Sequence, residues 1–304
     1  MEVSETHKDS KGREYWGDLN IGSTTQYKAI KIEELIRNFF PSKCGNILDI
    51  GSGSNCDHLL KYRQLLGAKK IACLDYDEKI INQMRQQFPN EGIGWYVADI
   101  FDLPEFKEGF DLIFFLDMLH EVYSFYGRPS RDMSEPVDRN RGLEAVIRAI
   151  NNISNITNSK GGMVITDAIL PSQQGNLIIR PRTPEVEEAV NYFFENYPTK
   201  RFDKVYREGD LITLSPSNFS ILSRQYDKIK NKDWTRWNIE RLEQHQYMTK
   251  EQYENLFAKL GFKTHIIIGT PDTIKKEWDQ DFEIVSGLKE FPPRRVTLLA
   301  MKEK

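Results

Sequence analysis

The feature that most constrains this chain is an alternation of short apolar strands with amphipathic helices between residues 46 and 170. The apolar stretches are too continuous for strands that face water on one side, so both faces of the sheet need a cover of helices. Right-handed crossovers between such strands predict an α/β, doubly wound, Rossmann-like and mostly parallel sheet. We expect strands at 46–50, 70–75, 94–99, 111–117 and 162–170, and helices at 27–40, 57–67, 78–88 and 141–153.

The alternation stops after residue 170. Residues 171–247 contain helical stretches such as 185–197 but no regular rhythm of strand and helix, and we interpret them as a mainly helical insertion that caps the carboxyl edge of the sheet. Regularity returns with a helix at 250–262, which ends near Gly261.

Two further strands complete the sheet at 263–269 and 294–302. Only a polar loop, 270–293, separates them, so we expect them to pair antiparallel and to make the last strand of a seven-stranded sheet antiparallel. The expected organisation is a tail or lid segment at 1–26, a main domain formed by 27–170 and 248–304, and a substrate cap at 171–247.

Composition excludes several classes of protein. The 304 residues carry a net charge of −3, which gives no reason to expect a membrane surface or nucleic acid as partner. No apolar run reaches about 18 residues, and the polar start does not look like a secretory signal. Three cysteines without CxxC spacing (Cys44, Cys56 and Cys73) predict reduced thiols and a cytoplasmic protein.

The strongest local signal is the turn after the first strand, which contains Gly51 and Gly53. Glycines let the backbone approach a ligand and adopt positive φ, and open parallel sheets bind ligands at this edge. Dinucleotide-binding folds also begin in this way, but the third glycine of their fingerprint is missing here. Asp75 and Asp99 end the second and third expected strands, where one carboxylate can accept both ribose hydroxyls and the other an adenine amino group.

Together these segments resemble the class I methyltransferase family, because four motifs occur in the right order on the right strands. The resemblance covers about residues 30–170 and 248–302. Its motifs are similar to Asp49-Ile50-Gly51-Ser52-Gly53 (the first motif), Asp75 (the ribose-binding acid), Ala98-Asp99-Ile100 (the adenine-binding corner) and residues 110–117 (the fourth strand).

The resemblance implies S-adenosylmethionine as the cofactor. The residues expected to form its site are Asp49, Gly51, Ser52, Gly53, Asp75, Tyr76, Asp99, Ile100, Leu116 and Asp117. Within this set Asp49 is expected to support the loop more than to touch the ligand. Two alternatives stay open: Asp75 as the cap of the helix at 78–88, and Asp99 as a turn residue.

His120 is the candidate catalytic residue, three positions after the fourth strand. It resembles the histidine of a Leu-His segment in many small-molecule methyltransferases and, with a pKa near neutral, is a candidate general base. The alternative is a structural histidine at the start of a helix. Asp117 and Asp167 look a little like the metal carboxylates of catechol-type O-methyltransferases, but the asparagine expected after the second acid is Ala168, and we expect no metal.

The function expected is transfer of a methyl group to oxygen or nitrogen of a small acceptor that is anionic or planar. Arginines and aromatic residues favour such an acceptor: Tyr123, Tyr126, Arg128, Arg131, Arg139, Arg180, Arg182, Trp234 and Trp237. The alternatives are an RNA or protein methyltransferase, a non-catalytic S-adenosylmethionine-binding protein and a nicotinamide dehydrogenase. The fourth motif lacks the Asn-Pro-Pro-aromatic run of base-methylating enzymes, and no RNA-binding module is attached.

Overall fold

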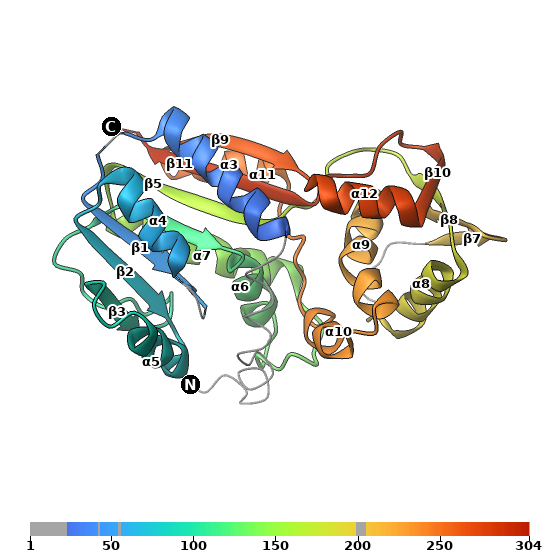
Figure 1. Cartoon of the computed structure of the whole chain (residues 1–304), viewed down its shortest axis with the longest axis horizontal. Helices are drawn as coiled ribbons and strands as arrows, with labels where there is room; N and C mark the ends of the chain where they lie inside the picture. Colours follow the sequence, from blue (N-terminus) through green and yellow to red (C-terminus); the bar gives the residue numbers. More distant parts are fainter. Residues whose placement is uncertain (1–22, 42, 54–55, 199–204, 304) are drawn as a thin grey trace.

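The computed structural model describes residues 23–41, 43–53, 56–198 and 205–303. Within them the main sheet consists of β1 (Asn46–Ile50), β2 (Lys70–Asp75), β3 (Ile93–Val97), β4 (Phe110–Leu116), β5 (Thr157–Ala168), β9 (Phe262–Gly269) and β11 (Arg295–Lys302). These strands lie in the order β3-β2-β1-β4-β5-β11-β9 (Figure 1). The first five in that order run parallel, and β11 is antiparallel to both its neighbours. The expected sheet and its antiparallel last strand are confirmed.

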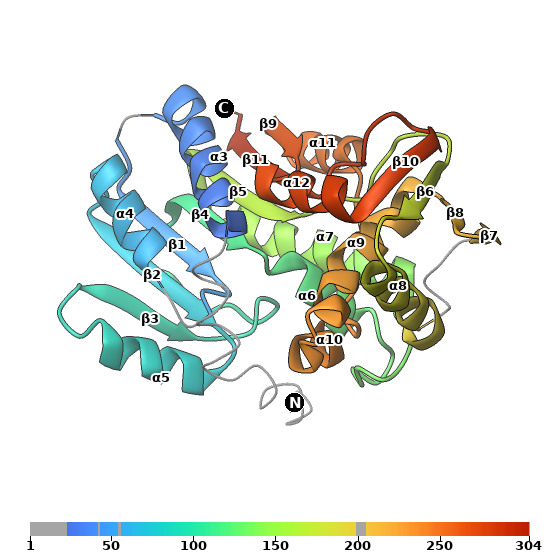
Figure 2. The same ribbon diagram turned by 45° about the vertical axis from the view of Figure 1, so that its right-hand side comes forward.

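Helices cover both faces of this sheet (Figures 1 and 2). One layer contains α3 (Ser23–Phe39), α4 (Asp57–Leu66) and α5 (Glu78–Gln87), and the other contains α6 (Leu119–Tyr126), α7 (Arg139–Ile156) and α11 (Lys250–Lys259). Alternate residues of β4 face the two helix layers. Phe114 packs in the first core, under α3, α4 and α5, and Phe115 packs in the second core, under α6, α7 and α11. Both side chains are fully buried. This division explains why the strands are apolar throughout.

A second, smaller sheet lies beside the main one (Figure 2). Its strands are β6 (Leu177–Pro181), β7 (Tyr206–Glu208), β8 (Leu211–Leu214) and β10 (Phe282–Gly287), in the antiparallel order β10-β6-β8-β7. The helices around it are α8 (Pro184–Asn196), α9 (Pro216–Lys230), α10 (Trp234–Glu240) and α12 (Asp272–Asp281). This unit has a hydrophobic core of its own, separate from the two cores of the main sheet. Its large aromatic members include Phe193, Phe219, Trp237 and Trp278.

The structure corrects the sequence analysis in this second unit. Residues 171–247 are mainly helical, but they also contribute three strands that were not expected. Residues 270–293 are not a loop, since they form α12 and β10, and they join the second sheet rather than the main one. Helix α12 escaped detection because Trp278 and Asp281 are its only buried residues, too few for an apolar stripe.

The chain start is only partly described. Residues 1–22 of the expected tail lie outside the described residues, and 23–26 form the first turn of α3 instead of a tail. In the described part of the chain no helix is long and apolar enough to cross a membrane. Cys44, Cys56 and Cys73 are buried free thiols.

Candidate active site

The glycine turn leads from β1 toward α4 at the carboxyl edge of the main sheet. Gly51 and Gly53 have φ values of 68° and 61°, which favour glycine. A side chain at position 51 would place its Cβ 2.5 Å from Met118 Cγ. Behind the turn, buried Asp49 contacts His58 Nε2 at 3.0 Å through Oδ2, while its Oδ1 has no hydrogen-bond partner among the described residues. The turn therefore has the backbone geometry and an open acceptor that suit a bound ligand.

Asp75 is the last residue of β2, as expected, and is 5% exposed. Its Oδ1 accepts a hydrogen bond from Asp77 N at 2.9 Å. Burial raises the pKa of Asp75 to about 7, against the lowering effect of that hydrogen bond. The cap of α5 is Asp77, which accepts from Lys79 N at 2.8 Å, so the alternative role of Asp75 as the cap is wrong. Tyr76 follows with an exposed side chain.

Asp99 does not end the third strand, because β3 stops at Val97 and Asp99 lies in the following turn. Its Oδ1 accepts from Phe101 N at 2.9 Å, and its Oδ2 accepts from the Tyr126 hydroxyl. Ile100 is buried in the core beside it. The carboxylate thus already shapes the turn, and an adenine amino group would share Oδ2 with Tyr126.

Asp117 follows β4 with an unusual φ of 56°. Lys28 Nζ of α3 lies 2.7 Å from its Oδ2, and Arg295 at the start of β11 donates to its Oδ1. Burial would raise the pKa of Asp117, but Arg295 and Lys28 hold it well below its ordinary value. The carboxylate is therefore ionised and already neutralised by two cations. Leu116 before it is half-buried against the first core.

His120 is the second residue of α6 and is 5% exposed. Its Nδ1 lies 2.8 Å from Asp167 Oδ1, and its Nε2 lies 3.7 Å from Glu243 Oε2. Burial would lower the pKa of His120, but the two carboxylates raise it to about 10. The neutral-range pKa expected from the sequence is therefore wrong. An imidazole that is protonated at neutral pH has no lone pair with which to accept a proton, so this arrangement does not support a general base.

Asp167, the second-last residue of β5, has no oxygen left for an ion. Its Oδ1 also accepts from Ala168 N at 2.7 Å, and its Oδ2 accepts from His120 N at 3.0 Å and from the Tyr247 hydroxyl at 3.1 Å. Since Asp117 is neutralised and Asp167 is saturated, this pair is a poor metal site.

The segment between α10 and α11 brings further polar side chains to the same edge. Glu243 and His245 are 1% and 3% exposed. The His245 ring packs edge-on against that of His120, with 4.3 Å between centroids. Its Nε2 lies 2.8 Å from Glu240 Oε2. Sequence reasoning missed these residues, because a polar segment without periodicity or ligand spacing gives no signal.

Three arginines meet near this cluster: Arg224 of α9, Arg294 and Arg295. Each keeps one buried nitrogen without a hydrogen-bond partner among the described residues, Nη1 of Arg224 and Nε of the other two. Burial and then Arg295 lower the pKa of Arg224, while burial and then Arg224 lower that of Arg294 to about 10. The sequence did contain a signal for them: Arg294 and Arg295 stand at the start of the last strand, and an antiparallel strand starts at the carboxyl edge of its neighbours.

Several arginines and aromatic residues chosen from the sequence have structural partners instead. Arg128 is fully buried and donates to the carbonyl oxygens of Ser124, Glu135 and Leu242. Tyr123 is buried and stacks on Tyr247. The others lie in contacts of the loops and of the second unit: Tyr126 with Asp99, Arg131 over Tyr126, Arg180 with Asp210 and Glu283, Arg182 with the Asp279 and Phe282 carbonyls, Trp234 beside Tyr192, and Trp237 in the second core.

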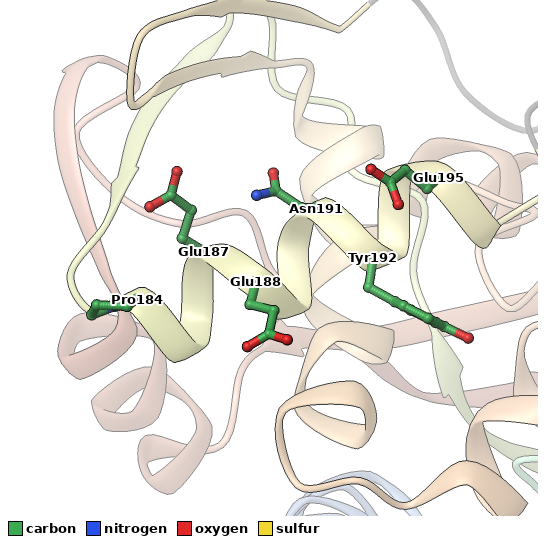
Figure 3. A pocket seen from close by; sticks show the side chains of 6 residues that line it. All are labelled: Pro184, Glu187, Glu188, Asn191, Tyr192 and Glu195. Carbon is green, nitrogen blue, oxygen red and sulfur yellow. The ribbon is translucent and has the colours of Figure 1, made fainter.

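A surface depression elsewhere is unrelated to this site. It lies along α8 and is lined by Pro184, Glu187, Glu188, Asn191, Tyr192 and Glu195 (Figure 3). All six residues come from one helix, and none belongs to the predicted site.

Comparisons with known proteins add the family context. Residues 47–126, which include the glycine turn, Asp75, Asp99 and His120, match the model of a family described as "Methyltransferase domain". No curated protein matches the chain.

Solved structures similar to the chain include an S-adenosylmethionine-dependent methyltransferase from Mesorhizobium loti, with 16% identity over 93% of this chain and 100% of that one (TM-score 0.49). A second is the N-methyltransferase NodS from Bradyrhizobium japonicum with S-adenosyl-L-homocysteine, with 17% identity over 55% of this chain and 74% of that one (TM-score 0.41). A third is the plantazolicin methyltransferase BpumL, with 10% identity over 96% and 89% (TM-score 0.48).

Proposed function

We propose that this chain, in which residues 47–126 match the model of a methyltransferase-domain family, is a class I, S-adenosylmethionine-dependent methyltransferase. It methylates a small anionic acceptor at the carboxyl edge of the main sheet. The cofactor supplies an activated methyl group: an acceptor lone pair forms the new bond to the methyl carbon as the carbon–sulfur bond breaks. The electron pair of that bond stays on sulfur, which yields S-adenosylhomocysteine, and the acceptor proton passes to solvent.

The cofactor site of this proposal follows the residues expected from the sequence. The turn of Gly51, Ser52 and Gly53 admits the ligand to the backbone, with Asp49 behind it. A ribose diol that donates to Asp75 would stabilise a carboxylate that burial disfavours in its charged form. The remaining proposed contacts are Tyr76 at the ribose, Asp99 and Ile100 at the adenine, and Leu116 and Asp117 beside the reacting end.

The observation that carries the acceptor class is the arginine cluster. Burial, and then the charge of Arg295, lowers the pKa of buried Arg224, and Arg224 and Arg295 each keep an N–H donor without a partner among the described residues. A carboxylate or phosphate would relieve their repulsion and satisfy those donors, and guanidinium groups suit both anions.

We propose that residues 171–247 cap this site. Helix α9 contributes Arg224, and the segment after α10 places Glu243 and His245 beside His120. Such a cover excludes water and aligns the acceptor with the methyl carbon, which by itself can supply most of the rate acceleration. No proton acceptance by His120 is needed.

The test is a methylation assay that measures S-adenosylhomocysteine formation with hydroxylated or aminated carboxylates and phosphates, each paired with its neutral ester. We expect turnover of the anions and not of the esters. Arg224→Gln should raise KM by about tenfold or more, the scale of a lost charged hydrogen bond, with S-adenosylhomocysteine affinity unchanged. Arg180→Gln, an exposed arginine of the second sheet, is the matched control. Equal turnover of acids and esters, or methylation of RNA or protein alone, would overturn the proposal.

A further inference from the structure

Three buried side chains at the carboxyl edge converge as a potential metal-ligand set. His120, Glu243 and His245 each offer one ligand atom, and these atoms all lie within 4.8 Å of one another. They come from the start of α6 and from the segment between α10 and α11, so the fold brings them together from distant parts of the chain.

The surroundings of the two histidines fit ligation. His120 Nδ1 is held by Asp167 at 2.8 Å, which directs Nε2 toward Glu243 at 3.7 Å. His245 Nε2 is held by Glu240 at 2.8 Å, and its buried Nδ1 has no partner among the described residues. Metal-binding histidines characteristically give their other ring nitrogen to a carboxylate, which fixes the ring and raises its basicity. Here both histidines have such a carboxylate.

We propose that His120 Nε2, Glu243 and His245 Nδ1 bind one divalent transition-metal ion. Two imidazoles and one carboxylate are the ligand set of many Zn²⁺ and Fe²⁺ sites, and they leave coordination positions open. Mg²⁺ and Ca²⁺ prefer oxygen ligands and fit poorly. The site differs from the Asp117 and Asp167 pair considered from the sequence, and it goes against the expectation of no metal.

Charged groups of both signs surround the proposed ion. Asp167, which lies 2.8 Å from His120 Nδ1, and Glu243 place negative charge next to it. Arg224 acts electrostatically on His245 as well as on Glu240 and Asp117, whereas Lys28 and Arg295 contact Asp117. Metal binding is independent of the proposed methyl transfer, since it can be measured without cofactor or acceptor.

The experiment uses the full chain, stripped with a chelator and titrated with Zn²⁺ and Co²⁺. We expect one equivalent of either ion to bind and bound Co²⁺ to give a visible absorption spectrum. Glu243→Gln and His245→Asn should lose that spectrum. Glu240→Gln should keep it but weaken affinity by about 10–100-fold, as removal of an outer carboxylate does. His265→Asn, a histidine of β9 stacked on Phe39, is the matched control and should bind as the unaltered chain does.

Folding is checked by circular dichroism and by S-adenosylhomocysteine affinity in each variant. If His245→Asn does not fold, the near-isosteric Glu243→Gln carries the test. Failure of the unaltered chain to take up one equivalent would overturn the proposal, and so would a Co²⁺ spectrum that survives in folded Glu243→Gln. Methylation activity enters neither result, so a failure here is distinguishable from failure of the proposed function.

Discussion

His120 is bound by Asp167 through two atoms at once: the His120 backbone N–H donates to Oδ2 at 3.0 Å, and Nδ1 lies 2.8 Å from Oδ1. The same carboxylate accepts from Ala168 N and from the Tyr247 hydroxyl. One fully buried acid therefore joins the end of β5, the start of α6 and the segment before α11. The position of the His120 ring depends on this junction.

Asp167→Asn tests the junction. The amide keeps the shape but loses the charge and cannot accept at both positions, which leaves a buried imidazolium poorly paired. We expect the free energy of unfolding at neutral pH to fall by about 3 kcal/mol, the scale for breaking a buried ion pair, measured by urea denaturation. Asp102→Asn, an exposed acid after β3, should change stability by less than about 0.5 kcal/mol. Equal effects of the two substitutions would contradict a structural role for Asp167.

Gly51→Ala tests the cofactor turn, and Gly67→Ala is its matched control. Both glycines have φ near 60°, but a Cβ at Gly67 meets nothing within 4 Å, whereas one at Gly51 meets Met118. Both changes should cost about 1 kcal/mol of stability through φ. Only Gly51→Ala should weaken S-adenosylhomocysteine binding by calorimetry, by about tenfold or more. Unaltered affinity in that variant would remove the turn from the proposed site.

Much of this fold could be predicted because strands buried on both faces have a recognisable apolar sequence. Strands β1 and β2 match the expected bounds, since their residues are apolar on both faces. Strand β10 has no such pattern, because it is short and Phe282 is its only buried residue. Its partner, β6, is also distant in the sequence. At the site, the position of Asp75 could be predicted because this residue ends strand β2. Glu243 and His245 acquire their surroundings only when separate segments meet, so no spacing in the sequence marks them.

Asp75 gives the proposed cofactor site a pH dependence. Burial raises its folded pKa to about 7, above the value of an unfolded aspartate, and like charges on Glu121 and Asp77 act in the same direction. The group therefore contributes stability below the unfolded pKa that is lost as pH rises through about 7. Ribose hydroxyls that donate to the charged carboxylate favour the opposite state, so binding should strengthen as pH rises.

We expect S-adenosylhomocysteine affinity to fall about tenfold between about pH 8 and about pH 6, with proton release on binding. Calorimetry in buffers of different ionisation enthalpy measures both. Asp75→Asn should bind more weakly at high pH and show a flat profile. A profile that keeps its slope in this variant would assign the titration to another group.

Arg128 provides the clearest contrast between a functional and a structural arginine. Its fully buried guanidinium donates to three backbone carbonyls, two of them before α7 and one at Leu242, far along the chain. Arg128→Met keeps much of the volume but leaves these acceptors unsatisfied. Since each such loss costs about 1–3 kcal/mol, we expect the free energy of unfolding to fall by about 3 kcal/mol or more in urea.

Arg139→Met is the control, because Arg139 is an exposed arginine at the first position of α7 and should change stability by less than about 0.5 kcal/mol. The distinction from an acceptor-binding role lies in the kinetics. If Arg128 only holds the backbone around these carbonyls, Arg128→Met should keep the KM for an anionic acceptor within about threefold of the value for the unaltered chain. The comparison is made at temperatures where the variant is folded. A rise in KM comparable with that of Arg224→Gln, without loss of stability, would place Arg128 in the acceptor site instead of in a structural role.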